Sequence, residues 1–237
     1  MTLLHADYNA GEGPPIVFLH GFMGRCADWA AIAGRTAEVT GRATLAFDLP
    51  GHGRSSLSDL RDWEDVGAAL VAAVEARTNS TRFDLVGYSM GGRLALVTRV
   101  LQPQAVRSLL VIGAHPALRT PGERVARTFH DHELAAQLST DEAGFLDQWE
   151  SNPLFGAATS PAWRAARARR RNDAAPKSFA WSEALRCFTL GGQPDTWARL
   201  PDEGPCVFIA GQDDPKYCAI GKEFAALGPL RTFHAIP

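Results

Sequence analysis

Residues 83–93 read FDLVGYSMGGR, a short apolar run followed by a glycine-rich turn and then by helix-forming residues. The pattern Gly-x-Ser-x-Gly in this context is typical of a strained strand-to-helix turn that exposes a serine hydroxyl at the end of a sheet. Gly87 and Gly91 let strand and helix approach closely, and the helix N-terminus favours developing negative charge. We therefore expect Ser89 to be the reactive side chain. The alternative is an incidental serine in a glycine-rich turn.

Further short apolar runs flank this turn along the chain. They lack strict alternation of polar and apolar residues, which is typical of strands buried on both faces of a parallel sheet. Segments 62–76 and 93–101 carry apolar residues at helical spacing, so strands and helices alternate. The runs expected to form strands are 16–19, 44–47, 83–86, 108–112, 206–209 and 230–236.

This alternation stops between residues 114 and 204, where helix-forming segments with prolines and tryptophans take over. We expect a core formed by residues 1–113 and 205–237, with a helical cap inserted at 114–204. Such a cap would cover the strand ends, exclude water and supply contacts to a substrate. A chain of 237 residues with 46% hydrophobic content is expected to form a single domain.

The composition argues against several function classes. Lys+Arg 24 against Asp+Glu 26 gives a net charge of -2, which provides no basic field for nucleic acid or an anionic membrane. The 4 cysteines show no metal-ligand spacing, and no signal segment or membrane-length apolar run is visible. We expect a soluble cytoplasmic protein, a monomer or weak oligomer, that binds a small molecule.

Two loops lie at the expected strand ends near Ser89. The first, residues 20–24, would place the backbone N–H of Phe22 beside that of Met90, and together these amides would form an oxyanion hole. The second, residues 48–55, is rich in turn-forming residues. We expect His20 and His52 to support these loops rather than to act as bases.

A reactive serine needs a histidine to take its proton and a carboxylate to orient that histidine, in the chain order Ser, acid, His for α/β-hydrolases. Asp214, directly after the strand at 206–209, is the expected acid, with Asp213 as a second choice; two solvated turn aspartates are the alternative. His234 lies inside the last expected strand and would not reach Ser89. The fold would place the histidine just beyond this strand, where the sequence stops at Pro237, and the closing helix is missing as well.

The fold expected from these motifs is the α/β-hydrolase fold. Nearly the whole chain resembles the 2-succinyl-6-hydroxy-2,4-cyclohexadiene-1-carboxylate synthase family of menaquinone biosynthesis. The resemblance rests on VFLHGFMG at 17–24, DLPGHG at 48–53 and LVGYSMGGR at 85–93, and continues with HPAL at 115–118, ERVAR at 123–127, Trp149, GGQP at 191–194 and DPKY at 214–217.

The resemblance implies an elimination in which a triad abstracts a proton from the substrate and pyruvate leaves. It implies no metal or organic cofactor. The substrate would carry several carboxylates, for which arginine guanidinium groups are suited. Arg93 and Arg127 match the anion-binding positions of the family, and among Arg169 to Arg171 the register is open, with Arg169 preferred. Tyr88 and Trp149 would line the pocket.

Two other functions remain open at this point. A carboxylesterase or lactonase would use Ser89 as a covalent nucleophile. A non-catalytic binding protein or a fragment is suggested by the histidine that the triad lacks. For the chain as written, we expect weak turnover and low stability, because the last strand would be an uncovered edge.

Overall fold

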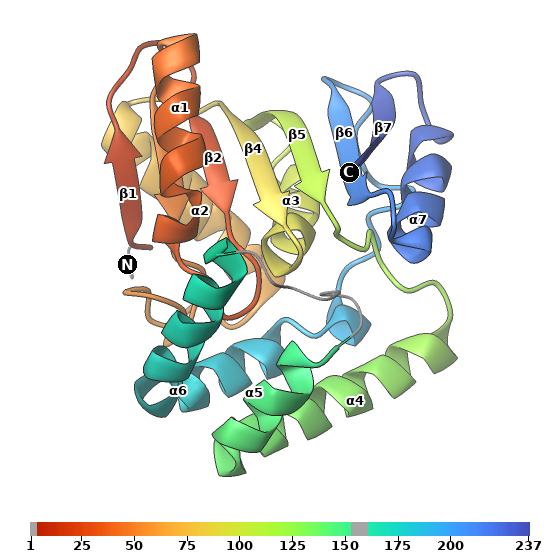
Figure 1. Ribbon diagram of the computed structural model, residues 1–237. Coiled ribbons are helices and arrows are strands. Elements are labelled where there is room, and N and C mark those ends of the chain that lie inside the picture. The colour runs from red at the N-terminus through yellow and green to blue at the C-terminus, as the bar shows by residue number, and fades with distance from the viewer. Residues whose placement is uncertain (1–3, 153–160) are drawn as a thin grey trace.

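The computed structural model describes residues 4–152 and 161–237. Its centre is a seven-stranded sheet with the order β1-β3-β2-β4-β5-β6-β7, in which only β1 runs antiparallel to its neighbour (Figure 1). This is the α/β-hydrolase architecture expected from the sequence. The strands are β1 (Ala6–Asn9), β2 (Ile16–Leu19), β3 (Thr44–Phe47), β4 (Phe83–Tyr88), β5 (Val106–Ile112), β6 (Cys206–Gly211) and β7 (Arg231–Ile236).

Every strand expected from the sequence is present. Strands β4 and β6 end two residues later than expected, and β5 begins two residues earlier. The strand that the sequence analysis did not predict is β1. Its four residues are half-buried or exposed and include two polar side chains, so they show no apolar run. The strand forms because its backbone pairs with β3, with Ala6 opposite Phe47.

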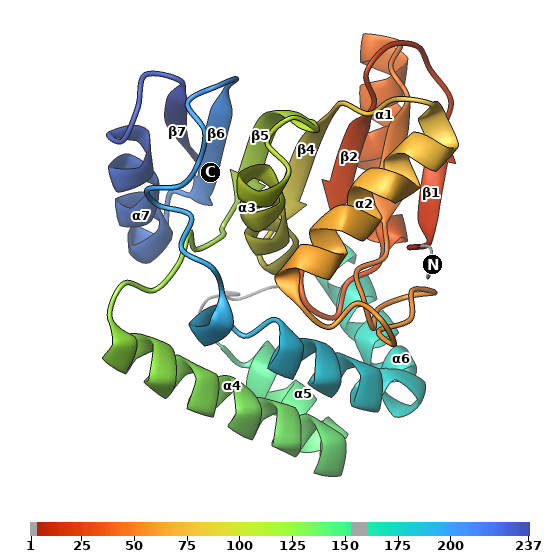
Figure 2. The same cartoon turned by 180° about the vertical axis from the view of Figure 1, so that it is seen from behind.

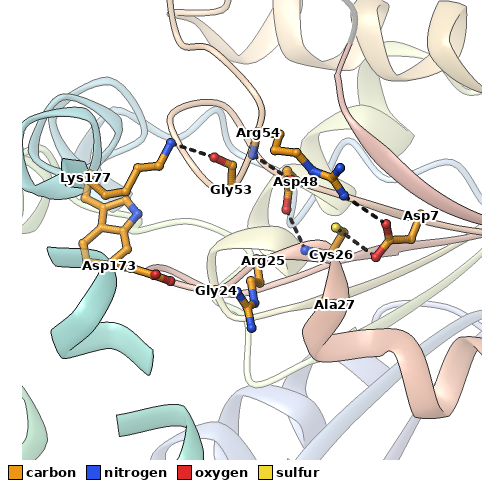
Figure 3. A pocket seen from close by; sticks show the side chains of 11 residues that line it. Asp7, Gly24, Arg25, Cys26, Ala27, Asp48, Gly53, Arg54, Asp173 and Lys177 are labelled. Carbon is orange, nitrogen blue, oxygen red and sulfur yellow. Dashed lines mark hydrogen bonds and ion pairs between the residues drawn. The ribbon is translucent and has the colours of Figure 1, made fainter. Parts of the chain in front are cut away.

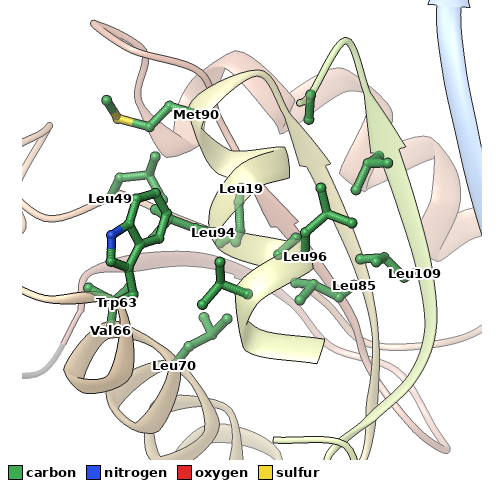
Figure 4. Close-up of a cluster of buried hydrophobic side chains, with 14 of the residues drawn as sticks. Leu19, Leu49, Trp63, Val66, Leu70, Leu85, Met90, Leu94, Leu96 and Leu109 are labelled. Atoms are coloured by element: carbon green, nitrogen blue, oxygen red, sulfur yellow. The ribbon is translucent and has the colours of Figure 1, made fainter. Parts of the chain in front are cut away.

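Helices cover both faces of the sheet (Figures 1 and 2). On one face, α1 (Ala30–Thr40) packs with the preceding turn over β2 and β3, where the rings of Phe18 and Trp29 lie 5.2 Å apart. The opposite face carries α2 (Trp63–Thr78), α3 (Met90–Leu101) and α7 (Pro215–Ala225), which share the larger hydrophobic core. Figure 4 shows this core beneath the start of α3, with Trp63 beside Leu94. The start of α3 is thereby fixed against the sheet.

Among the described residues of 114–204, three further α-helices lie at the carboxyl ends of the parallel strands (Figure 1). They are α4 (Pro121–Thr140), α5 (Glu142–Glu150) and α6 (Pro161–Cys187). Helix α4 begins where Thr120 and Glu123 cap each other's backbone N–H groups. Leu138, Phe145 and Trp181 from these helices pack against Met23 in the loop after β2. This contact joins the helices to the loop that follows the second strand.

Strand β7 forms one edge of the sheet beside β6. Helix α7 covers one of its faces, where a side chain at Gly221 would come within 2.2 Å of Phe233. On the other face, Thr232, His234 and Ile236 are exposed. The placement of His234 within the last strand therefore agrees with the expectation from the sequence.

Candidate active site

Ser89 occupies the turn between β4 and α3 with φ 51 and ψ -114, a conformation that side-chain-bearing residues rarely adopt. Such backbone strain costs roughly 1–3 kcal/mol and persists only where surrounding structure enforces it. Here the Ser89 N–H donates to the Ile112 carbonyl at 2.9 Å, and the Ser89 carbonyl accepts from the Arg93 N–H at 3.0 Å. The turn is held from the strand on one side and from the helix on the other.

The glycines around Ser89 are required by close backbone approach. A Cβ at Gly91 would lie 2.4 Å from the His20 carbonyl oxygen, and one at Gly87 would lie 2.5 Å from the Gly91 carbonyl oxygen. Neither contact leaves room for a methyl group. The Gly-x-Ser-x-Gly pattern therefore reflects packing between α3, β4 and the loop after β2.

A cavity of about 80 Å³ lies against the Ser89 side of this turn. We call it the Ser89 cavity. It brings together residues from the first loop, the turn, α3, α4 and α5, among them six that the sequence analysis singled out: Phe22, Ser89, Met90, Arg93, Arg127 and Trp149. Residues more than 100 positions apart in the chain thus line one small space.

Arg93 lies one helical turn after Ser89 and is 8% exposed. Its Nη1 donates to the Phe188 carbonyl at 2.8 Å, and its guanidinium lies 5.6 Å from the centre of the Trp63 ring. Burial, together with the charge of Arg127, lowers the pKa of Arg93 to about 10. The group remains cationic at neutral pH, and its low exposure strengthens its attraction for an anion in the cavity.

Arg127 is held by a carboxylate that the sequence analysis did not identify. Its Nε donates to Asp131 Oδ1 at 2.8 Å, one helical turn along α4. Asp131 is fully buried, and its Oδ2 accepts from the Thr189 hydroxyl at 2.6 Å and the Leu190 N–H at 3.2 Å. The i, i+4 spacing of Arg127 and Asp131 was the available signal, whereas the Thr189 contact depends on the tertiary fold.

Tyr88 and Arg169 line a second, larger cavity rather than the Ser89 cavity. This cavity of about 460 Å³, here called the Arg170 cavity, is bounded by the loop after β2, α1 and α6, and Phe22 belongs to both cavities. Arg169 is engaged there, since its Nη1 donates to the Met23 carbonyl at 3.3 Å and its Nη2 donates to Asp28 at 3.2 Å. Two residues predicted to contact the substrate thus line the neighbouring cavity and not the Ser89 cavity.

Arg170 differs from both of its neighbours. It is 9% exposed, and its Nε and Nη2 atoms are buried without a hydrogen-bond partner in the part of the chain that the structure describes. Its nearest carboxylate is Glu150 at 3.6 Å. Arg171, by contrast, donates to both Asp147 and Glu150 at 2.6 Å. Of the three arginines left open by the sequence, Arg170 is the one beside this cavity whose Nε and Nη2 have no hydrogen-bond partner among the described residues.

The expected oxyanion-hole amides belong to Phe22 and Met90. Met90 is the first residue of α3, where backbone N–H groups have no carbonyl one turn earlier. The Phe22 loop rests on His20, whose Nδ1 bonds to the Gly21 carbonyl at 2.7 Å while its Nε2 accepts from the Leu49 N–H at 3.0 Å. His52 Nδ1 similarly bonds to the Pro50 carbonyl at 2.9 Å. Burial lowers the pKa of His20 to about 4 and that of His52 to about 3.

Asp214 lies at the carboxyl end of β6 and caps α7, where its Oδ1 accepts from the Tyr217 N–H at 2.9 Å. It is half-buried, and Asp213 is exposed. Tyr217 lines the Ser89 cavity, but Asp214 itself does not. His234 on β7 is paired with Ile209 and is likewise absent from that lining. An orienting carboxylate acts through its histidine, so Asp214 would need a third residue to reach Ser89.

A further group of polar side chains lines a cavity of about 370 Å³ beside the second loop (Figure 3). His5, Cys26 and Asp48 each place one possible metal-ligand atom within 4.8 Å of the others. Asp48, however, accepts from the Cys26 N–H at 2.7 Å and the Arg54 N–H at 2.8 Å. Burial and the nearby carboxylates raise the pKa of the Cys26 thiol to about 12. These contacts give the group a role in holding the loop.

Several known proteins are similar to this chain in sequence or in fold. A model described as alpha/beta hydrolase family matches residues 16–237. The 2-succinyl-6-hydroxy-2,4-cyclohexadiene-1-carboxylate synthase of Escherichia coli O1:K1 / APEC is 32% identical over 229 residues, covering 94% of this chain and 88% of that protein. The enzyme of the same name from Salmonella agona (strain SL483) is 31% identical over 228 residues, with the same shares of 94% and 88%.

Solved structures show the same architecture. MenH from S. aureus superposes with a TM-score of 0.86 at 24% identity, covering 98% of this chain and 89% of that one. The enol-lactonase from Burkholderia xenovorans LB400 gives 0.76 at 17% identity, covering 98% and 87%. No helix within the described residues is long and apolar enough to cross a membrane. The chain belongs to the alpha/beta hydrolase family and, within it, to the 2-succinyl-6-hydroxy-2,4-cyclohexadiene-1-carboxylate synthases.

Proposed function

We propose that this protein eliminates pyruvate from 2-succinyl-5-enolpyruvyl-6-hydroxy-3-cyclohexene-1-carboxylate to form 2-succinyl-6-hydroxy-2,4-cyclohexadiene-1-carboxylate. The observation that carries the proposal is the Ser89 cavity, where a strained serine lies with two arginines in a chain similar to synthases of that name. A substrate with several carboxylates suits this lining, because guanidinium groups bind carboxylates through paired hydrogen bonds.

In the proposed reaction a ring C–H bond breaks and its proton passes to Ser89. The electron pair forms the new ring double bond, and the C–O bond to the enolpyruvyl group breaks. Pyruvate leaves as its enolate and takes up a proton, so that no oxidant or reductant is consumed. The serine acts as a base once the histidine of a triad draws its own proton, and Asp214 orients that histidine.

The remaining side chains of the cavity have binding roles in this proposal. The N–H groups of Phe22 and Met90 stabilise negative charge that develops on an oxygen of the substrate. Arg93 and Arg127 anchor carboxylates, and the latter is fixed for this by Asp131. Trp149, which lies 5.5 Å from Phe22 ring to ring, forms an apolar wall. In the neighbouring cavity, Arg170 would bind a further carboxylate.

The test separates elimination from ester hydrolysis. The protein is incubated with the enzymatically prepared precursor, and pyruvate is followed by coupled oxidation of NADH. In parallel, the intact mass is measured after exposure to p-nitrophenyl acetate. We expect pyruvate release that requires Ser89 and no stable acyl adduct. A stable adduct on Ser89 without pyruvate release would instead indicate an esterase or lactonase.

A further inference from the structure

We propose that His115 is a specificity residue of the Ser89 cavity, where it donates a hydrogen bond from Nε2 to an oxygen of the polycarboxylate substrate. The inference rests on the proposed function. It adds a neutral hydrogen-bond donor to the cationic side chains of Arg93 and Arg127 in the Ser89 cavity. His115 follows β5 in the chain and lines the same cavity as Ser89, Arg93 and Arg127.

The ring of His115 is held in one orientation. Its Nδ1 accepts from the Ala117 N–H at 3.2 Å, and its ring lies edge-on to that of Trp197 at 6.3 Å. The backbone around it is fixed as well, because Gln193 Nε2 donates to the carbonyls of both His115 and Pro116 at 2.9 Å. A ring held from the backbone and from a neighbouring ring presents its remaining nitrogen in a defined direction.

The Ala117 contact also assigns the tautomer. Because Nδ1 accepts this hydrogen bond, it carries no proton in the neutral ring, and the proton lies on Nε2. In residues 4–152 and 161–237, no backbone or side-chain oxygen accepts a hydrogen bond from this Nε2 atom. The donor is therefore available to a ligand in the cavity.

The surrounding charges keep the ring neutral. Burial lowers the pKa of His115 to about 4, and the cations Lys216, Arg127 and Arg93 act in the same direction, against a smaller opposing effect of Glu123. With Nδ1 engaged and Nε2 protonated, the neutral ring has no free lone pair with which to accept a proton from Ser89. His115 thus does not replace the histidine of a triad, and its chemistry at neutral pH is that of a donor.

Two substitutions separate donation from local structure. In His115→Asn, the side-chain oxygen can take the place of Nδ1 and accept from the Ala117 N–H, but no donor reaches the position of Nε2. In His115→Gln, the amide N–H reaches toward that position. His132→Asn is the matched control, because His132 is an exposed histidine on α4 outside the cavity.

The experiment measures binding of the product, 2-succinyl-6-hydroxy-2,4-cyclohexadiene-1-carboxylate, by titration calorimetry, together with thermal melting. We expect His115→Asn to weaken binding by about 10-fold, the size typical of one hydrogen bond to a charged group, with an unchanged melting temperature. His115→Gln should recover much of this loss, and His132→Asn should bind as the unsubstituted protein does.

The outcomes distinguish this inference from the function on which it rests. If the unsubstituted protein binds the product and His115→Asn binds it equally well, the inference is wrong and the proposed function stands. If the unsubstituted protein does not bind the product, the proposed function is wrong, and the inference that rests on it is wrong as well. Equal losses in His115→Asn and His115→Gln, with lowered melting temperatures in both, would show a purely structural role and also overturn the inference.

Discussion

The Ser89 cavity and the Arg170 cavity share Phe22 of the loop after β2, yet their arginines are held differently. In the Ser89 cavity, Arg127 is fixed by the buried carboxylate of Asp131 and Arg93 by a backbone carbonyl. In the Arg170 cavity, Arg169 pairs with the half-exposed Asp28. Among the described residues, Arg170 Nε and Nη2 have no hydrogen-bond partner, and Nη2 lies 3.6 Å from Glu150. The difference favours chemistry in the small, preorganised Ser89 cavity and binding of part of the substrate in the larger Arg170 cavity.

The largest expected effect comes from the turn that both cavities adjoin. Gly91→Ala would place a methyl group 2.4 Å from the His20 carbonyl oxygen, where backbone on both sides must shift. We expect destabilisation of about 3 kcal/mol or more, together with loss of activity. Urea unfolding measures the first quantity.

Gly34→Ala is the matched control for this substitution. Gly34 lies within α1, where an added Cβ would meet nothing within 4 Å. Because alanine is favoured over glycine in helices, the control should be stabilised by about 0.5–1 kcal/mol. If the two variants had similar stability, the close approach at Gly91 would not be what holds the turn.

The next largest expected effect is the difference between removing the acidic partner of Arg127 and removing that of Arg169. Asp131→Asn removes a buried charge from Arg127 and perturbs the bonds from Thr189 and Leu190. We expect it to cost about 1–3 kcal/mol, because a buried carboxylate that accepts three hydrogen bonds is replaced by a neutral amide, while the Arg127 charge left behind is partly exposed. Asp28→Asn changes the more exposed partner of Arg169 and should cost less than about 1 kcal/mol. Equal losses in urea unfolding would refute the proposed difference between the cavities.

Two buried histidines, one in each of the two loops, should make stability depend on pH. His20 and His52 have folded-state pKa values of about 4 and about 3, below the usual 6.5, so only the unfolded chain binds protons there between these values. Stability therefore falls as pH drops below 6.5, and each ring contributes up to about 1.4 kcal/mol per pH unit. Above that pH neither ring has an effect.

Urea unfolding at a series of pH values between 7.5 and 4.5 measures this dependence. His20→Asn removes one titrating ring while keeping an N–H that can donate to the Gly21 carbonyl. Its slope should be shallower than that of the unsubstituted protein. An unchanged slope would mean that His20 does not stay neutral in the folded state.

The smallest effect sharpens the binding role of the Arg170 cavity. Arg170→Gln removes the guanidinium with unused donors, and Arg171→Gln removes one that Asp147 and Glu150 already engage. Steady-state pyruvate release should show KM raised about 10-fold by the first substitution and less than about 2-fold by the second. A larger rise for Arg171→Gln would reassign the anion contact.

The turn and the sheet were predictable because their signals are local. The spacing Gly87-x-Ser89-x-Gly91 fixes a close approach that few other sequences permit. The position of Arg93 near Ser89 was predictable as well, because Arg93 lies one helical turn further along α3. Strand β1 was missed because pairing with β3, rather than apolar content, makes it a strand. It could not be read from four residues alone.

The choice among consecutive arginines was also beyond the sequence. Arg169 pairs with Asp28 in the turn before α1, whereas Arg170 and Arg171 both lie against Glu150 of α5 and differ in how closely they approach it. Asp131 and His115 acquire their roles from contacts with residues 58 and 78 positions away. Such contacts exist only once α4, α6 and the loop after β5 are folded together.

The central claim is that the Ser89 cavity performs the elimination and that the Arg170 cavity only binds. The most direct test is single-turnover release of pyruvate, with product affinity measured on the same preparations of the unsubstituted protein and Ser89→Ala. We predict that Ser89→Ala loses at least about 10³-fold in rate and keeps its product affinity within about 3-fold. Pyruvate release from Ser89→Ala at the rate of the unsubstituted protein would contradict the account.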